Sequence, residues 1–283
     1  MKKKLLFLAC LGITQLTNAQ TNIEFEEYDL DNGLHVILHE DHSTPIVAVS
    51  VLYHVGSKNE PQGRTGFAHF FEHLMFEGSP NIGRGEFTTI VQANGGAINA
   101  NTSFDRTFYY EILPSNQFEL GLWLESERML HATVDNKGVE TQREVVKEEK
   151  RLRIDNQPYM SFQQNMFEKA FADHPYGHTP LGSMEDLNAA QISDFADFYE
   201  TFYVPDNATL SIAGDIDPDE AKELIKKYFS DIEKGSKDIP RPKPAFSVMN
   251  GEMVDTVYDN IQLPAIFLGY RIPGQSTKDS YAL

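Results

Sequence analysis

Two histidines and an acid stand close together in residues 66–74, and their spacing suits metal chemistry. His69 and His73 are four residues apart, and Glu72 lies between them. On a helix, residues four apart share a face, so both imidazoles can reach one Zn²⁺. Glu72 borders that face, where it would crowd the metal as a third ligand but can take a proton from metal-held water. The segment therefore predicts a zinc site with Glu72 as the general base.

The competing interpretation is a core helix whose histidines are satisfied by hydrogen bonds. That is the usual state of one histidine on an apolar face. Two histidines at ligand spacing with an acid between them seldom arise by accident, and this order of residues is the inverted zinc-peptidase motif. We therefore favour the metal interpretation for His69 and His73.

A catalytic zinc needs a third protein ligand, and the acids of residues 140–149 are the candidates. In a helix over this region one face would carry Val139, Gln142, Val145, Val146, Glu149 and Leu152. The opposite face would carry Glu140, Glu144, Glu148 and Arg151. A carboxylate on the apolar face is costly unless it has a partner, and a metal supplies one. We therefore predict Glu149, rather than Glu148, as the third ligand of one Zn²⁺ per chain.

The elements that must position these residues mix helices and strands. Short runs rich in valine and aromatic residues predict strands at 34–38, 46–55, 107–112 and 208–213. Longer periodic runs that end at glycine or proline predict helices at about 65–76, 86–93, 116–131, 138–154, 162–171 and 192–202, and from 217 onward. This mixture predicts an α+β domain of two layers, with helices packed on a mixed or antiparallel sheet.

The first residues have the pattern of a secretory signal. Three lysines precede a short apolar stretch, and small residues follow at 17–19. The apolar stretch is too short to span a bilayer. We expect residues 1–19 to be removed and the protein to be exported, as a periplasmic or secreted protein without a membrane anchor.

The end of the chain predicts a second domain. Residues 20–232 have enough elements for one complete zinc-bearing domain, and the proline-rich stretch 233–247 is typical of a linker. Residues 248–283 offer two strands, at 254–258 and 265–270, and the beginning of a helix at 277. So few elements cannot bury a core of their own. We expect residues 248–283 to be the start of a truncated second domain.

Charge and cysteine content exclude several classes of function. The formal net charge of −18 argues against binding to nucleic acid or to anionic lipid. Cys10, the one cysteine of the sequence, lies in the predicted signal peptide. Any metal in the mature protein must therefore be held by histidine, aspartate or glutamate.

The chain resembles the pitrilysin/insulinase family of zinc metallopeptidases. The resemblance is carried by residues 69–73 together with 143–149, and by the further matches at 53–57, 95–100, 174–177, 182–187 and 213–215. The family carries a distal glutamate ligand, which the resemblance assigns to Glu149 in agreement with the argument from helix faces. One position departs from the pattern, because many members have an acid where this chain has Gln142.

The resemblance implies a clamshell of two related α+β domains around a chamber. The substrate would be an unfolded peptide, added as a strand against the sheet edge at 99–102. Asn99 and Ala100 match the family's substrate-contacting pair, although Asn99 is equally well explained as a turn residue after two glycines. The expected function is a zinc metalloendopeptidase. Two alternatives stay open, namely a non-catalytic subunit and a zinc-bearing half that needs a second domain or a partner subunit to close the chamber.

Overall fold

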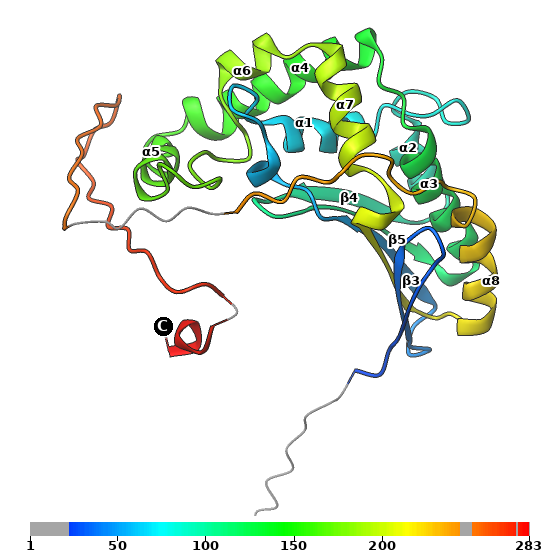
Figure 1. The fold of residues 1–283 in the computed structure, drawn as a ribbon. Coiled ribbons are helices and arrows are strands. Elements are labelled where there is room, and N and C mark those ends of the chain that lie inside the picture. Colours follow the sequence, from blue (N-terminus) through cyan, green and yellow to red (C-terminus); the bar gives the residue numbers. More distant parts are fainter. Residues whose placement is uncertain (1–22, 244–250, 276, 283) are drawn as a thin grey trace, which may run out of the picture.

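A six-stranded sheet underlies the structure, a computed structural model that describes residues 23–243, 251–275 and 277–282 (Figure 1). Its strands are β1 (Glu26–Asp29), β2 (His35–Glu40), β3 (Ile46–Tyr53), β4 (Ala97–Thr102), β5 (Thr107–Pro114) and β6 (Ala208–Gly214). The order across the sheet is β1-β2-β6-β3-β5-β4. Strands β2 and β6 are parallel and the other neighbours are antiparallel. The sheet is therefore mixed, and β4 lies at one edge.

Helices form the second layer. They are α1 (Phe67–Leu74), α2 (Glu86–Ala93), α3 (Phe118–His131), α4 (Asn136–Lys150), α5 (Ser161–Ala170), α6 (Met184–Ala189), α7 (Ile192–Phe202) and α8 (Pro218–Phe229). Figure 1 shows α1, α4, α6 and α7 gathered on one side of the sheet. Among the described residues no helix has both the length and the apolar character needed to cross a membrane.

The strands show why the domain has two layers. Along β3 the residues Val47, Val49 and Val51 are buried, whereas the residues between them are half-buried. Because side chains alternate between the faces of a strand, one face of the sheet is covered by helices and the other is more open. The predicted two-layer α+β fold is confirmed.

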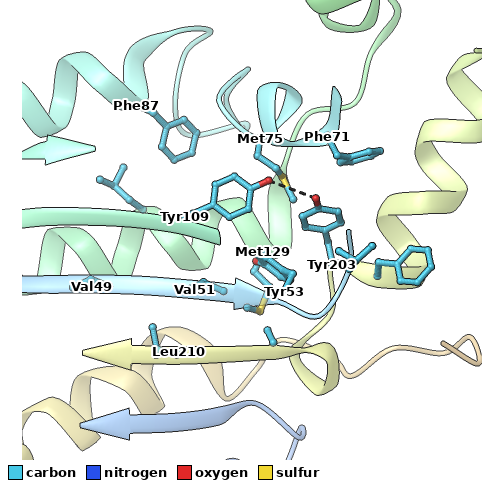
Figure 2. Close-up of a cluster of buried hydrophobic side chains, with 14 of the residues drawn as sticks. Val49, Val51, Tyr53, Phe71, Met75, Phe87, Tyr109, Met129, Tyr203 and Leu210 are labelled. Carbon is cyan, nitrogen blue, oxygen red and sulfur yellow. Dashed lines mark hydrogen bonds between the residues drawn. The ribbon is translucent and has the colours of Figure 1, made fainter. Parts of the chain in front are cut away.

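Helix α1 is held by aromatic packing. The ring of Phe67 stacks on Phe195 of α7 with centroids 4.6 Å apart. Phe71 lies against Phe198 and Tyr203 at 5.2 and 5.1 Å, and Figure 2 shows Phe71 and Tyr203 on the same side of the strands. Burial of a large apolar side chain contributes about 1.5–3 kcal/mol. This packing fixes the orientation of α1 and thereby of the polar residues on its other face.

The main differences from expectation within the domain are two unpredicted elements and both ends of one helix. Strand β1 and helix α6 were not predicted, although Ser183 caps α6 by accepting a hydrogen bond from the Asp186 N–H at 3.0 Å. Helix α4 begins at Asn136, because Asp135 caps it. It ends at Lys150, where the π turn η3 (Arg151–Asp155) takes over.

The predicted strands at 254–258 and 265–270 are wrong, because neither range forms a strand in the structure. A strand needs a neighbouring strand to pair with its backbone N–H and C=O groups. Among the described residues, no strand pairs with either range. The segment contacts α5 instead, where Phe267 stacks on Phe162 at 4.1 Å. Leu268 and Tyr270 are exposed. Residues 278–282 form a short 3₁₀ helix near the expected helix start.

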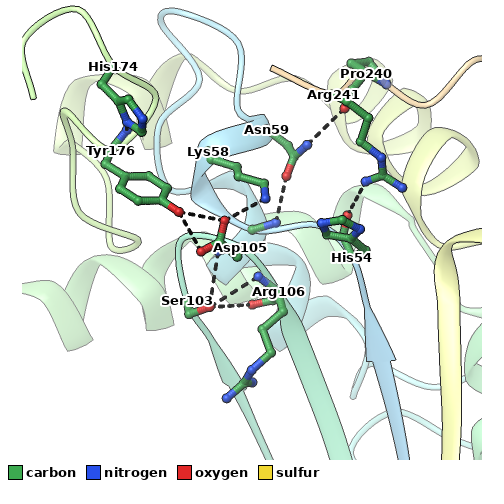
Figure 3. Close-up of polar contacts among 11 residues, drawn as sticks. His54, Lys58, Asn59, Ser103, Asp105, Arg106, His174, Tyr176, Pro240 and Arg241 are labelled. Carbon is green, nitrogen blue, oxygen red and sulfur yellow. Dashed lines mark hydrogen bonds and ion pairs between the residues drawn. The ribbon is translucent and has the colours of Figure 1, made fainter. Parts of the chain in front are cut away.

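The predicted leader at 1–19 and part of the predicted linker, 244–247, lie outside the described residues. The described linker residues contact the domain (Figure 3). The Asn59 amide donates to the Pro240 carbonyl at 3.2 Å, and Arg241 donates to the His54 carbonyl at 2.8 Å. The division into residues 20–232, a linker and a second domain stays a prediction.

Candidate metal centre

Helices α1 and α4 bring two imidazoles and a carboxylate together. His69 and His73 lie on α1, and Glu149 is the penultimate residue of α4. The Oε2 atom of Glu149 lies 3.1 Å from Nε2 of His73 and 3.5 Å from Nε2 of His69. One ligand atom from each residue lies within 4.8 Å of the others. Two nitrogens and one carboxylate oxygen are the donor set of a catalytic zinc site that keeps its fourth position open, so the residues fit this metal.

The charges of this group suit a cation. Burial, and then the neighbouring His73, lower the pKa of His69 to about 4. Its imidazole is therefore neutral at neutral pH, and neutral imidazole is the form that binds metals. The hydrogen bond from His73 lowers the pKa of Glu149, and this effect outweighs the burial that would raise it. The third donor is therefore a carboxylate.

Glu72 lies beside the group and contacts the edge of the sheet. Its Oε2 accepts a hydrogen bond from Oγ1 of Thr102, the last residue of β4, at 2.6 Å. Burial raises the pKa of Glu72, and the hydrogen bond from Thr102 opposes that rise. The sequence pattern gave no sign of the Thr102 contact, because only the sheet brings that hydroxyl to α1.

Asn99 and Ala100 lie in the edge strand β4. Asn99 pairs in register with Tyr110, and Ala100 with Tyr109. Asn99 is exposed and Ala100 is half-buried. Asn99 is therefore a strand residue and not the turn residue of the alternative interpretation. An edge strand leaves one row of backbone groups unpaired, and another chain can pair with that row.

Glu60 fixes the start of α1. Its carboxylate accepts hydrogen bonds from the N–H groups of Gly66 and Ala68, both at 2.9 Å, and lies 2.8 Å from Nε2 of His178. A carboxylate at this point satisfies N–H groups that the helix leaves without a partner. Gly66 has a φ of 91°, and a Cβ there would lie 2.9 Å from the Leu181 carbonyl oxygen. Glu60 could not be identified from the sequence pattern, because it lies too far before the helix to give a capping signal.

The turn after β4 is tied to two other segments (Figure 3). Asp105 accepts hydrogen bonds from Nζ of Lys58 at 2.6 Å and from the Tyr176 hydroxyl at 2.7 and 2.8 Å. Both partners are distant in sequence. These contacts fix the end of β4 that carries Thr102.

The apolar face predicted for α4 is only partly correct. Val139 and Val146 are buried, but Val145 and Leu152 are 44% and 56% exposed. The reason is that this part of the segment lies along the candidate site rather than over the core. A shallow depression of about 350 Å³ is lined there by Val145, Glu148, Glu149, Leu152 and Arg153. Glu148 pairs with Arg151, so the structure brings Glu149, not Glu148, to the histidines.

Gln142 lies apart from the metal group. Its side-chain amide donates to Oε1 of Glu77 at 2.5 Å. Glu77 is buried and also pairs with Arg84. A glutamate at position 142 would place a second carboxylate against the buried carboxylate of Glu77, and the neutral amide of Gln142 avoids this.

Comparison with known proteins identifies the family. The model described as Insulinase (Peptidase family M16) matches residues 35–183, and the model described as Peptidase M16 inactive domain matches residues 189–283. The chain therefore belongs to the M16 peptidase family, as the sequence resemblance predicted.

Individual relatives agree with this assignment. The zinc protease PqqE of Helicobacter pylori is 35% identical over 288 residues, which cover 99% of this chain and 65% of that protein. The crystal structure of a protease from Helicobacter pylori has a TM-score of 0.76 and 36% identity, with 78% of this chain and 54% of that chain covered. The periplasmic protease PqqL from Escherichia coli has a TM-score of 0.71 and 26% identity, with coverage of 78% and 25%. The chain thus spans less than two thirds of the length of each.

Proposed function

We propose that the protein is a zinc-dependent endopeptidase of unfolded peptides, with one Zn²⁺ held by His69, His73 and Glu149. The observation that carries the proposal is the meeting of the Glu149 carboxylate with both Nε2 atoms, at 3.1 and 3.5 Å, beside Glu72. Membership of the M16 peptidase family supports it. The Helicobacter pylori relative, which is named a zinc protease, supports it further.

Each residue has a distinct role in this proposal. Zinc, when bound, would lower the pKa of a water molecule and polarise the scissile carbonyl. Glu72 would take the proton of that water on its carboxylate and pass it to the leaving amine. The Thr102 hydroxyl, 2.6 Å from Glu72, holds the carboxylate in place for both transfers. His69 and His73 would hold the metal through ring nitrogens.

The substrate in this proposal is an extended peptide that pairs with β4. Its backbone would use the unpaired edge of β4, so that binding depends little on peptide sequence. Asn99 and Ala100 would contact it directly. Because Thr102 belongs to the same strand and contacts Glu72, a peptide on this edge would lie next to the general base.

The surroundings of the site are a further part of the proposal. Because the chain spans 65% of its Helicobacter pylori relative, we propose that efficient cleavage needs a second half that closes a chamber over β4, in the same chain or in a partner subunit. We also propose export to the periplasm or beyond, on the basis of the leader at 1–19.

The proposal is tested by comparing zinc content with peptidase activity in two isosteric variants. Glu72→Gln should keep zinc and lose peptide cleavage by orders of magnitude, because it removes the base and no ligand. Glu148→Gln, whose side chain points to Arg151 instead, is the control and should keep both. Full cleavage by Glu72→Gln would overturn the assignment of the base.

The proposed need for a second half is tested separately. The 283-residue chain would bind zinc but cleave peptides poorly. Cleavage would rise when a full second domain is fused or added separately, because that domain positions the substrate. Full activity of the 283-residue chain alone would overturn this part of the proposal.

A further inference from the structure

Arg153 contacts the predicted metal ligand but has no part in the proposed chemistry. Its Nη1 atom lies 3.1 Å from Oε1 of Glu149. The other oxygen, Oε2, is the one that faces His69 and His73. The two oxygens of one carboxylate therefore have separate partners, with the guanidinium on one side and the imidazoles on the other.

The backbone that carries Arg153 is unusual. Arg153 lies in the π turn η3, where the Asn156 N–H donates to the Arg151 carbonyl at 2.8 Å. Lys150, which is buried, pairs with Asp155 at 2.6 Å and closes the turn. Single π turns occur frequently at functional sites. This one follows Glu149 directly and leaves Arg153 within reach of its carboxylate.

The fold itself gains little from the contact. The Arg153 side chain is 70% exposed, and an exposed pair four residues apart on a helix contributes about 0.3–0.5 kcal/mol. The contact has a larger effect on the orientation of Glu149. The Glu149 side chain is only 16% exposed, and its rotation decides which carboxylate oxygen reaches the histidines. Partners that orient a metal ligand typically change metal affinity by about 10- to 100-fold.

We infer that Arg153 is a positioning residue that holds Oε1 of Glu149 and thereby presents Oε2 to the metal. The inference rests on the proposed zinc site. The positive charge of Arg153 also repels a cation, but its exposure to solvent screens that repulsion. We therefore expect the gain from a fixed carboxylate to exceed the loss from repulsion.

Arg151 provides a matched control. It makes the same kind of ion pair as Arg153, 3.1 Å long, but with Glu148, which does not face the histidines. Arg151 is also exposed. Replacing either arginine by alanine removes one surface ion pair and one positive charge. Only the Arg153 pair includes the predicted ligand Glu149.

The test is the affinity of the metal-free 283-residue chain for Zn²⁺, measured by competition with a chromophoric chelator. Arg153→Ala should weaken binding by about 10-fold or more, and Arg153→Gln by less, because its amide can still donate to Glu149. Arg151→Ala should stay within about twofold of the wild type. Melting temperatures of the metal-free variants should agree closely, because each change removes only a surface pair.

Two results would overturn the inference. One is zinc binding by Arg153→Ala that equals or exceeds that of the wild type. The other is equal loss in Arg153→Ala and Arg151→Ala, which would show that general charge and not the contact with Glu149 matters. A wild-type chain that takes up no Zn²⁺ would instead overturn the proposed function on which the inference rests.

Discussion

Replacing Glu60 by alanine should destabilise the domain strongly, although Glu60 lies outside every motif. The change leaves the N–H groups of Gly66 and Ala68 without their acceptor. Loss of a helix cap costs about 0.5–2 kcal/mol. It also leaves His178 without its carboxylate partner, and breaking a buried ion pair costs about 3–5 kcal/mol. Because His178 is partly exposed and water can replace its partner, we expect a total loss of about 3 kcal/mol.

Urea unfolding of the metal-free chain measures this loss. Glu60→Gln should lose less than Glu60→Ala, because its remaining oxygen still accepts one N–H. Glu223→Ala, an exposed glutamate on α8, is the control and should change stability by less than about 0.5 kcal/mol. A loss below about 1 kcal/mol in Glu60→Ala would refute the view that this carboxylate anchors α1.

Three further experiments test other parts of the structure. Burial lowers the pKa of His178, but the hydrogen bond and charge of Glu60 outweigh it and raise that pKa above its usual value. The stability that protonated His178 adds is therefore present below about pH 6.5 and is lost as the pH rises through the raised pKa. In urea unfolding, His178→Gln should therefore lower the free energy of unfolding more near pH 6 than near pH 9. Asp217→Ala removes the cap of α8 and should cost about 1 kcal/mol, whereas Asp219→Ala, at a 98% exposed side chain, should cost little. Limited proteolysis followed by mass spectrometry should remove residues 251–282 and leave the sheet domain folded, because this segment adds no strand to the sheet.

The helix that carries the candidate metal ligands could be predicted from sequence because its pattern is local. His69, Glu72 and His73 lie within five residues, and the phenylalanines between them indicate which face is buried. The strands β2, β3, β5 and β6 were likewise predicted within a few residues, because each is a short apolar run. The two-layer arrangement follows from that mixture of elements.

The remaining contacts of the site depend on tertiary structure. Thr102 reaches Glu72 only because β4 lies beside α1, and Glu60 reaches α1 from a loop. No local pattern encodes either contact. The face of α4 was misjudged at Val145, since periodicity cannot distinguish a face that borders a site from one that faces the core. The segment at 265–270 has strand composition but no strand partner among the described residues, so composition alone misled.

Elemental analysis of zinc in purified protein tests the central claim most directly. The wild type should hold about one Zn²⁺ per chain, because three ligands converge once. His69→Ala and His73→Ala should lose the metal, and Glu149→Gln should bind it weakly. Glu148→Gln should hold as much as the wild type, because Glu148 pairs with Arg151. Zinc retained in both histidine variants, or equal loss in the two glutamate variants, would contradict the assignment of the site.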